Sequence, residues 1–250
     1  MYNSFLVRLK ADSDLIIKDT VKEIYNSIES LGDNIGYFTI SSFLGCKKYN
    51  LNIEEGKKYI FKITTLDNDT FATITSNLFR KRITKDYLDI ENGKFKVVDI
   101  ILNDSNSKYI KIFTEKDLDY INSKECKRDM YDISILTPTI FKVGSKFYNK
   151  LDSEIIFRNL LSKFNKLSKY KIPKEFIENI NDINIIENDI IYSKVGLNNI
   201  YKEGLQGDIT IDLQNCDKYT KQIARTLIEF AVFSGIGYKS EYGYGSLYIK

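Results

Sequence analysis

Three residues near the N-terminus, Lys18, Lys22 and Tyr25, have types and spacing suited to acid–base chemistry. Intervals of four and three residues place them on one stripe of a helix. A lysine with a lowered pKa can act as a base, and a charged lysine can stabilise a negative transition state. The alternative is an ordinary solvated helix face. Lys47 and Lys48, further along the chain, are candidates of the same kind.

The chain contains no histidine, so it lacks the commonest acid–base side chain and the commonest transition-metal ligand. Its three cysteines, Cys46, Cys126 and Cys216, stand far apart, with neither a zinc-binding spacing nor a disulfide framework. We therefore expect no metal, no cofactor and a reducing, cytoplasmic location. No apolar run approaches the roughly 20 residues of a membrane span, so we expect no membrane partner.

A glycine-rich run lies close to the C-terminus, at residues 235–245 (GIGYKSEYGYG). Phosphate loops and dinucleotide fingerprints place their glycines before a helix, whereas this run follows an expected helix at 219–234. It precedes an expected strand at 246–249. Such a loop either faces a ligand or forms only a turn.

Basic residues concentrate between positions 142 and 174, opposed only by Asp152 and Glu154. A cluster of this size is typical of a surface that follows phosphates, or of a solvated lysine-rich helix face. Aromatic residues adjoin the cations here and in the glycine-rich run, which suits stacking on unpaired bases. The nine are Lys142, Lys146, Lys150, Arg158, Lys163, Lys166, Lys169, Lys171 and Lys174.

The elements of the first half follow the order β-α-β-β-α-β. Strands are expected at 4–10, 37–44, 58–65 and 95–102. A first helix, capped by Asp12 or Asp14 and ended by Gly32, buries Ile17, Val21, Ile24, Ile28 and Leu31. Asp69 is expected to cap a short second helix.

The second half repeats this order, with strands at 133–143, 190–200, 208–213 and 246–249. Asp152 is expected to cap its first helix, Pro173 to open a shorter one, and residues 219–234 to form its last. Residues 104–132 are expected to hold an added strand pair and the connection. The sequence thus predicts an α+β fold of two tandem ferredoxin-like (βαββαβ) domains, 1–128 and 129–250.

The glycine-rich run resembles the C-terminal loop of the CRISPR-associated repeat-processing endoribonucleases of the RAMP superfamily. Four further segments, in the same order along the chain, resemble conserved segments of that family. They are 37–45 (YFTISSFLG), 136–141 (LTPTIF), 156–165 (IFRNLLSKFN) and 204–208 (GLQGD). Each short motif is weak alone, and their order makes the match specific.

This resemblance implies metal-independent cleavage of RNA, in which a 2′-OH attacks the adjacent phosphorus. It implies a catalytic role for Tyr25, with Lys22 and Lys18 as candidates to replace a histidine that many members carry after the first helix. It also implies that Lys239, Ser240, Gly237 and Gly243 contact RNA. Lys142, Lys146 and Arg158 are the candidates in the basic stretch.

Two functions remain open at this point. One is a repeat-processing endoribonuclease, and the other is a related protein that binds RNA and cuts it poorly or not at all, since the histidine is missing. A small-molecule module is a third reading, disfavoured by the basic cluster. Candidate partners are CRISPR repeat RNA, subunits of an interference complex and a second copy of the chain.

Overall fold

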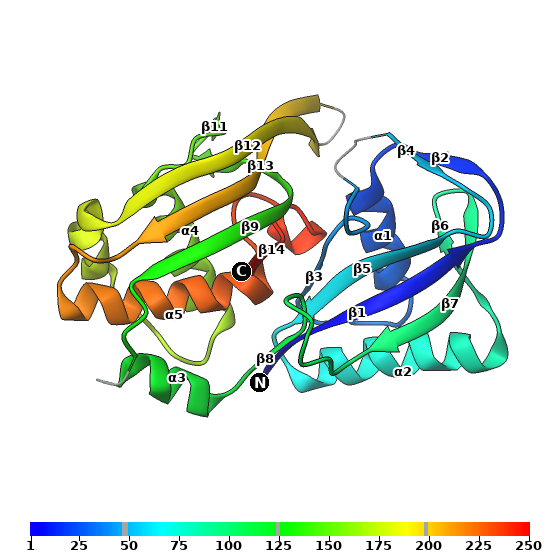
Figure 1. The fold of residues 1–250 in the computed structure, drawn as a ribbon, viewed down its shortest axis with the longest axis horizontal. Helices are drawn as coiled ribbons and strands as arrows, with labels where there is room; N and C mark the ends of the chain where they lie inside the picture. Colours follow the sequence, from blue (N-terminus) through cyan, green and yellow to red (C-terminus); the bar gives the residue numbers. More distant parts are fainter. Residues whose placement is uncertain (47–49, 124–125, 198–199) are drawn as a thin grey trace.

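The chain folds into two halves that lie side by side, each with a curved antiparallel sheet and its own helices (Figure 1). The structure, a computed structural model, describes residues 1–46, 50–123, 126–197 and 200–250. The candidate residues Lys47 and Lys48 lie outside this described part. No helix in the described part is long and apolar enough to cross a lipid bilayer.

The first half contains a five-strand path in the order β3-β5-β1-β7-β6, in which β8 also pairs with β1. Two helices connect its strands. A separate small pair, β2 and β4, lies beside this sheet. The elements are β1 (Tyr2–Ala11), β2 (Leu15–Ile17), α1 (Thr20–Glu29), β3 (Phe38–Ile40), β4 (Leu51–Ile53), β5 (Lys58–Thr65), α2 (Asn68–Thr84), β6 (Tyr87–Ile90), β7 (Gly93–Ile101) and β8 (Lys111–Phe113).

The second half contains a four-stranded sheet in the order β12-β13-β9-β14, and a separate hairpin formed by β10 and β11. Helix α3 (Glu115–Asn122) links the two halves. The remaining elements are β9 (Met130–Thr139), β10 (Phe141–Val143), β11 (Lys146–Tyr148), α4 (Ser153–Leu167), η1 (Lys174–Asp182), β12 (Asn184–Leu197), β13 (Ile200–Asp212), α5 (Lys218–Ser234), η2 (Ser240–Tyr242) and β14 (Leu247–Ile249).

The two sheets share one topology. When the main strands of each half are numbered along the chain, both sheets read second, third, first, fourth. This is the order of a ferredoxin-like βαββαβ unit, so the predicted tandem of two such folds is confirmed. The division of the chain into domains at residue 128 stays a prediction. Phe113 and Ile121 come before this residue, yet they pack in the apolar core of the second half.

The start of α1 differs from the prediction. Residues 15–17 pair with β4 as strand β2, so neither Asp12 nor Asp14 caps the helix. The cap is Asp19, whose side chain accepts a hydrogen bond from the backbone N–H of Lys22. The helix ends at Glu29, ahead of Gly32, and buries Val21, Ile24 and Ile28 as predicted. Ile17 is buried on β2 instead, and Leu31 lies beyond the helix.

Other boundaries also differ. Asp67 rather than Asp69 caps α2, which is long rather than short. Strand β9 ends at Thr139, and the chain continues into the β10–β11 hairpin. The segment after Pro173 is a 3-10 helix. In place of the strand pair expected at 104–132, β8 pairs with β1 and α3 packs against α5.

The halves interlock through shared core residues and polar contacts. Ile140, Val195 and Tyr244 of the second half join the apolar cluster of the first. Fully buried Lys62 of β5 donates from Nζ to the carbonyls of Val232 (3.1 Å) and Leu247 (2.6 Å) in the second half. Burial lowers the pKa of Lys62 to about 7, and the nearby charge of Lys111 acts in the same direction.

Candidate nucleic-acid interface

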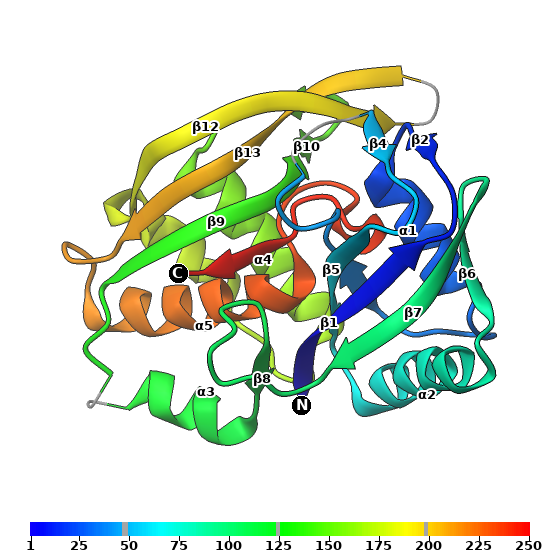
Figure 2. The same ribbon diagram turned by 45° about the vertical axis from the view of Figure 1, so that its right-hand side comes forward.

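The glycine-rich loop lies where the two halves meet, between the end of β9 and the β3–α1 region (Figure 2). Gly235 ends α5 by donating from its N–H to the Ala231 carbonyl. The backbone of Ile236 then bonds to the Gly245 carbonyl at 2.9 Å, which closes the loop on itself. All four glycines have φ between 65° and 90°, a region that other residues avoid.

Close packing gives a second reason for these glycines. A Cβ at Gly237 would lie 2.7 Å from the Ile140 carbonyl oxygen, and one at Gly245 would lie 1.9 Å from that of Ile236. A Cβ at Gly243 would lie 2.6 Å from the side chain of Ile40, in the first half. Gly237 and Gly243 therefore allow the loop to pack closely between the halves. We call this loop, residues 235–245, the wedge.

Helix α4 holds the loop from one side through two residues one turn apart. The Asn159 side chain accepts from the Gly237 N–H at 2.9 Å and donates to the Gly237 carbonyl at 3.4 Å. Lys163 Nζ donates to the Gly235 carbonyl at 3.1 Å. Burial lowers the pKa of Lys163 to about 7, while the negative charge of Glu241 acts in the opposite direction.

The segment Thr137-Pro138-Thr139 of β9 holds the loop from the other side. Thr137 Oγ1 donates to the Gly243 carbonyl at 2.8 Å and accepts from the Ser246 N–H at 2.8 Å. Pro138 accepts from the Gly245 N–H at 3.2 Å. The motif at residues 136–141 (LTPTIF) thus holds the glycine-rich loop in place through Thr137 and Pro138.

Ser240 and Lys239, both predicted to contact RNA, differ in how far their side chains are buried. Ser240 is fully buried, and its Oγ lies 3.2 Å from the Tyr37 hydroxyl, which also donates to the Ser234 carbonyl. Its side chain supports the loop from within. Lys239 is half-buried in the left-handed region at φ 59°, with its Nζ 5.5 Å from the Tyr242 ring centroid.

Four side chains form what we call the cation–aromatic cluster: Lys142, Phe147, Lys202 and Tyr238. The two rings meet edge to face with centroids 5.6 Å apart. Lys142 Nζ lies 5.6 Å from the Phe147 centroid and 5.1 Å from that of Tyr238, while Lys202 Nζ lies 6.0 Å from Phe147. Both lysines are exposed and both rings are half-buried, so the cluster presents charge and ring surface together.

Other basic residues of the stretch 142–174 have different partners. Lys146 is exposed on β11, next to Phe147. Arg158 pairs with Glu154 one turn away, and Lys169 pairs with Glu115 of α3. Lys163 turns inward toward the glycine-rich loop. These neighbours in sequence therefore have different partners, and a phosphate-following surface in this stretch stays a prediction.

The predicted catalytic stripe is also divided. Lys18 precedes α1, and its backbone N–H donates to the Glu91 carboxylate in the β6–β7 turn. Lys22 is exposed on the first turn of α1. Tyr25 is buried, stacks on Phe38 with centroids 4.7 Å apart, and meets the glycine-rich loop at Tyr242. The structure thus brings Tyr25, and not Lys18, to the loop.

Tyr25 is suited to donate a proton or a hydrogen bond rather than to act as a base. Burial, together with its hydrogen bond to the Glu29 carboxylate at 3.0 Å, raises the pKa of Tyr25. The phenol is therefore neutral at physiological pH. Within the described part of the chain, no three acidic, cysteine or histidine residues gather closely enough to hold a metal ion.

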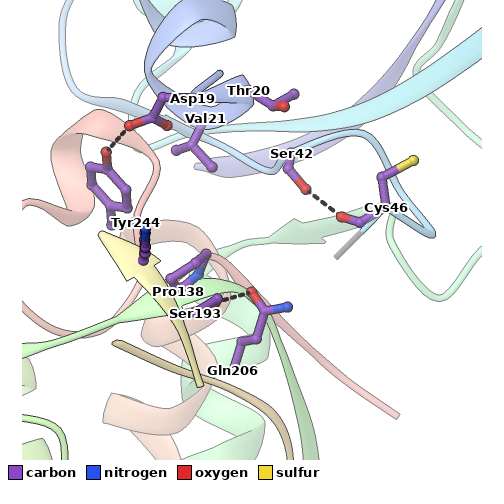
Figure 3. A pocket seen from close by; sticks show the side chains of 10 residues that line it. Asp19, Thr20, Val21, Ser42, Cys46, Pro138, Ser193, Gln206 and Tyr244 are labelled. Carbon is purple, nitrogen blue, oxygen red and sulfur yellow. Dashed lines mark hydrogen bonds between the residues drawn. The ribbon is translucent and has the colours of Figure 1, made fainter. Parts of the chain in front are cut away.

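A small cleft lies between the halves at the N-terminal end of α1 (Figure 3). The Asp19 carboxylate there accepts from the Tyr244 hydroxyl at 2.8 Å, which ties the glycine-rich loop to the cap of α1. The residues that line the cleft are Asp19, Thr20, Val21, Ser42, Cys46, Pro138, Ser193, Lys194, Gln206 and Tyr244.

Sequence reasoning missed Lys202, Asn159 and this cleft. Asn159 and Lys163 are four residues apart on a helix, so their shared face was visible in the sequence. Lys202 follows no local pattern that links it to Phe147. The cleft combines residues from both halves, and only the folded chain shows it.

The model of the family described as CRISPR-associated endoribonuclease Cas6 matches residues 133–247, which include the Thr-Pro-Thr support and the glycine-rich loop. No curated protein matches the chain in sequence.

Solved structures resemble the whole chain. A Cas6 in complex with its product has a TM-score of 0.80 at 17% identity, with all of both chains covered. A Cas6 from Thermus thermophilus has a TM-score of 0.73 at 15% identity, covering 100% of this chain and 98% of that one. The product of a Cas6-related gene from Pyrococcus furiosus has a TM-score of 0.66 at 15% identity, covering 100% and 99%.

The chain therefore shares with these solved structures a fold of two tandem ferredoxin-like halves. The resemblance drawn from the sequence motifs is confirmed: the model of the Cas6 family matches residues 133–247, and solved Cas6 structures share the fold of the whole chain.

Proposed function

We propose that this protein binds CRISPR repeat RNA and cuts it without a metal ion, through attack of a 2′-OH on the adjacent phosphorus. The observation that carries the proposal is the glycine-rich loop, which lies inside the matched family region and is held between the halves by β9 and α4. The loop places Tyr238 in the cation–aromatic cluster and Tyr242 against Tyr25. RNA bound along this loop can therefore reach both groups of side chains.

The roles of individual residues belong to this proposal. Tyr25 donates a hydrogen bond to charge that develops on the phosphate, and Lys22 adds positive charge at the exposed side of the same helix. Lys18 stays a candidate with its side chain exposed outside the helix. Lys239, Lys142, Lys146 and Arg158 are proposed phosphate contacts, Gly237 and Gly243 shape the loop, and Ser240 supports it from within.

The test is incubation of the purified chain with RNA transcribed from the CRISPR repeat of its own genome, in excess chelator. We expect one cut per repeat, leaving a 2′,3′-cyclic phosphate and a 5′-hydroxyl. Products with other ends, or cleavage that requires added metal, contradict the mechanism. RNA ends are identified by phosphatase and kinase treatment before gel analysis.

A second function is favoured by two observations: the chain has no histidine, and the Tyr25 hydroxyl is already bonded to Glu29. In this case the protein binds repeat RNA and does not turn it over. Tight binding without any product selects it, and efficient turnover eliminates it.

The catalytic assignments are tested separately with Tyr25→Phe, Lys22→Met and Lys18→Met. Loss of a general acid or base usually slows catalysis by about 10²- to 10⁴-fold. We expect Tyr25→Phe to slow cleavage strongly and to leave RNA affinity unchanged. Equal rates for all three variants and the wild type place the chemistry elsewhere.

We further propose that the protein meets its RNA in the cytoplasm. Subunits of an interference complex and a second copy of the chain stay candidate partners. Analytical ultracentrifugation with and without repeat RNA tests the second copy, since a dimer doubles the sedimenting mass.

A further inference from the structure

We propose that Tyr37 is a positioning residue, whose hydroxyl fixes the wedge against the first half so that Tyr242 stays in contact with Tyr25. The kinetic part of this inference rests on the proposed function, because it takes Tyr25 to act in cleavage. Tyr37 directly precedes β3 in the first half. The 3-10 helix η2, which lies in the wedge, packs against both β3 and α1 (Figure 1).

The first observation is that Tyr37 reaches from the first half into the second. Its ring packs against the apolar core of the second half. Its hydroxyl donates to the carbonyl of Ser234, the last residue before the wedge, at 2.8 Å. The same hydroxyl lies 3.2 Å from Ser240 Oγ and accepts from it, because a phenol has only one proton to donate. One hydroxyl therefore fixes both the start and the middle of the wedge.

The second observation is that Ser240 sets the position of Tyr242. Ser240 is fully buried and is the first residue of η2. The N–H of Gly243 donates to the Ser240 carbonyl at 2.9 Å, which closes this turn. Tyr242 lies within the turn and meets Tyr25 edge to face, with ring centroids 5.1 Å apart. A shift of Ser240 therefore moves Tyr242 relative to Tyr25.

The third observation is that the residue after Tyr37 supports the other ring of this contact. Phe38 is buried and stacks on Tyr25 with centroids 4.7 Å apart. It is also paired with Thr65 of β5, so the segment is anchored in the sheet. Two adjacent residues thus position both rings: Phe38 supports Tyr25, and Tyr37 supports Tyr242 through Ser240.

The Tyr37 hydroxyl keeps its proton under physiological conditions. Burial raises the pKa of Tyr37, the hydrogen bond with Ser240 acts in the opposite direction, and the charge of Glu241 raises it further. The donor to the Ser234 carbonyl is therefore always present. Its removal leaves the Ser234 carbonyl and the Ser240 hydroxyl without this partner, which favours local opening of the wedge.

The first test measures hydrogen–deuterium exchange of the RNA-free chain by mass spectrometry, for the wild type, Tyr37→Phe and Ser240→Ala. A buried group left without its partner shifts a local opening equilibrium by roughly 5- to 160-fold. We expect peptides that cover η2 to exchange faster by a factor in this range in both variants. Peptides from α2 should exchange as in the wild type.

The double variant Tyr37→Phe/Ser240→Ala tests whether the two hydroxyls act together. If Ser240 acts through Tyr37, the double variant should exchange no faster at η2 than the more affected single variant. Two factors that simply multiply in the double variant contradict the link between the hydroxyls.

The second test measures single-turnover cleavage of repeat RNA together with RNA affinity. Misplacement of a reacting group costs up to about 10²-fold in rate, so both single variants should cleave roughly 10- to 100-fold more slowly. Affinity should stay within about twofold, since only the reacting geometry changes. Gly237 and Tyr238 keep their own bonds to Asn159 and to the Ile140 carbonyl. A merely structural role would lower rate and binding together.

The matched control is Tyr59→Phe. Tyr59 is also a buried tyrosine of the first half, and its hydroxyl accepts from the backbone N–H of Glu54 at 2.9 Å, in the loop before β5. This change should alter neither exchange at η2 nor cleavage. Melting temperatures show whether each variant remains folded, and Ser240→Ala keeps the test valid if Tyr37→Phe does not fold.

Three results overturn the inference: unchanged exchange at η2 in the folded single variants, equal losses of rate and affinity, or the same effects in Tyr59→Phe. Each leaves the proposed function intact. A wild type that does not cut repeat RNA counts instead against the proposed function, and exchange at η2 then decides the inference alone.

Discussion

The two halves use the same connection, from the second helix to the last strand, in different ways. In the first half this connection forms strand β6, which pairs with β7 at the edge of the sheet. In the second half it forms the glycine-rich loop, which leaves the sheet and packs against β3 and α1 of the first half. One topology therefore yields an edge strand in one half and an interdomain wedge in the other.

Both connections carry an aromatic ring beside a cation of a neighbouring strand, which makes the comparison sharp. In the first half, Lys94 and Lys96 lie 5.5 Å and 5.3 Å from the Tyr87 centroid. In the second half, Lys142 lies by Tyr238 and Phe147. A cation–aromatic contact alone thus does not define a binding site. The contact at Tyr238 differs from the contact at Tyr87 because it lies on the wedge between the halves.

The largest effect is expected from Gly245→Ala. Its Cβ would lie 1.9 Å from the Ile236 carbonyl at φ 70°, so the backbone must move. We expect RNA binding to be lost and unfolding free energy to fall by about 2–4 kcal/mol. Fluorescence anisotropy and denaturant melts measure the two effects.

The control for this change is Gly56→Ala in the first half. Gly56 has a similar φ of 73°, but the nearest atom to its Cβ is the Lys10 side chain at 3.8 Å. We expect a cost of about 1–2 kcal/mol from the left-handed backbone alone, with RNA affinity unchanged. Equal loss of RNA binding in both variants shows that general instability is the cause.

The next effect is expected from Tyr238→Ala and Phe147→Ala. Stacking of one base on an aromatic ring contributes about 1–3 kcal/mol, so each change should weaken RNA binding by roughly 5- to 160-fold. Tyr87→Ala is the matched change in the first half and should have no effect. Weaker binding in Tyr87→Ala places RNA on both connections.

A smaller effect is expected from Lys142→Gln. Removal of one phosphate contact should lower the magnitude of the slope of log affinity against log salt by about 0.7–0.9, the value for one released counterion. Lys94→Gln is the matched control, and its slope should equal that of the wild type. An unchanged slope for Lys142→Gln shows that the Lys142 ammonium contacts no phosphate and only packs against the aromatic rings.

Lys62 should affect stability and leave RNA binding unchanged. Burial lowers the pKa of folded Lys62 to about 7, below the usual lysine value of about 10.4 in the unfolded chain. Between these values the unfolded state binds more protons, so stability should rise with pH from about 7 to 10. Lys62→Met should reduce this rise in urea melts and leave the part that Lys163 contributes, because the pKa of Lys163 is also lowered to about 7. A variant as pH-dependent as the wild type contradicts the assignment.

Local patterns in the sequence predicted most of the fold. The spacing of apolar residues located α5, and Gly235 correctly marked its end. The start of α1 could not be predicted, because Asp12, Asp14 and Asp19 are all plausible caps. The pairing of β2 with β4, a contact between distant residues, selects the third.

The candidate site was less predictable because it is assembled from distant segments. Sequence proximity made Lys163 and Lys169 look like parts of one surface, yet one supports the glycine-rich loop and the other pairs with α3. Ser240 is polar and sits in a glycine-rich loop, but it is buried against Tyr37. Side-chain direction depends on the packing of two halves, which no local pattern records.

Photo-crosslinking tests most directly whether RNA lies on the wedge of the second half. Repeat RNA substituted with 4-thiouridine is irradiated in complex with the wild-type chain, and crosslinked peptides are identified by mass spectrometry. We predict adducts on peptides that contain Phe147 and Tyr238. Adducts on the Tyr87 peptide, with none on the other two, would contradict this placement.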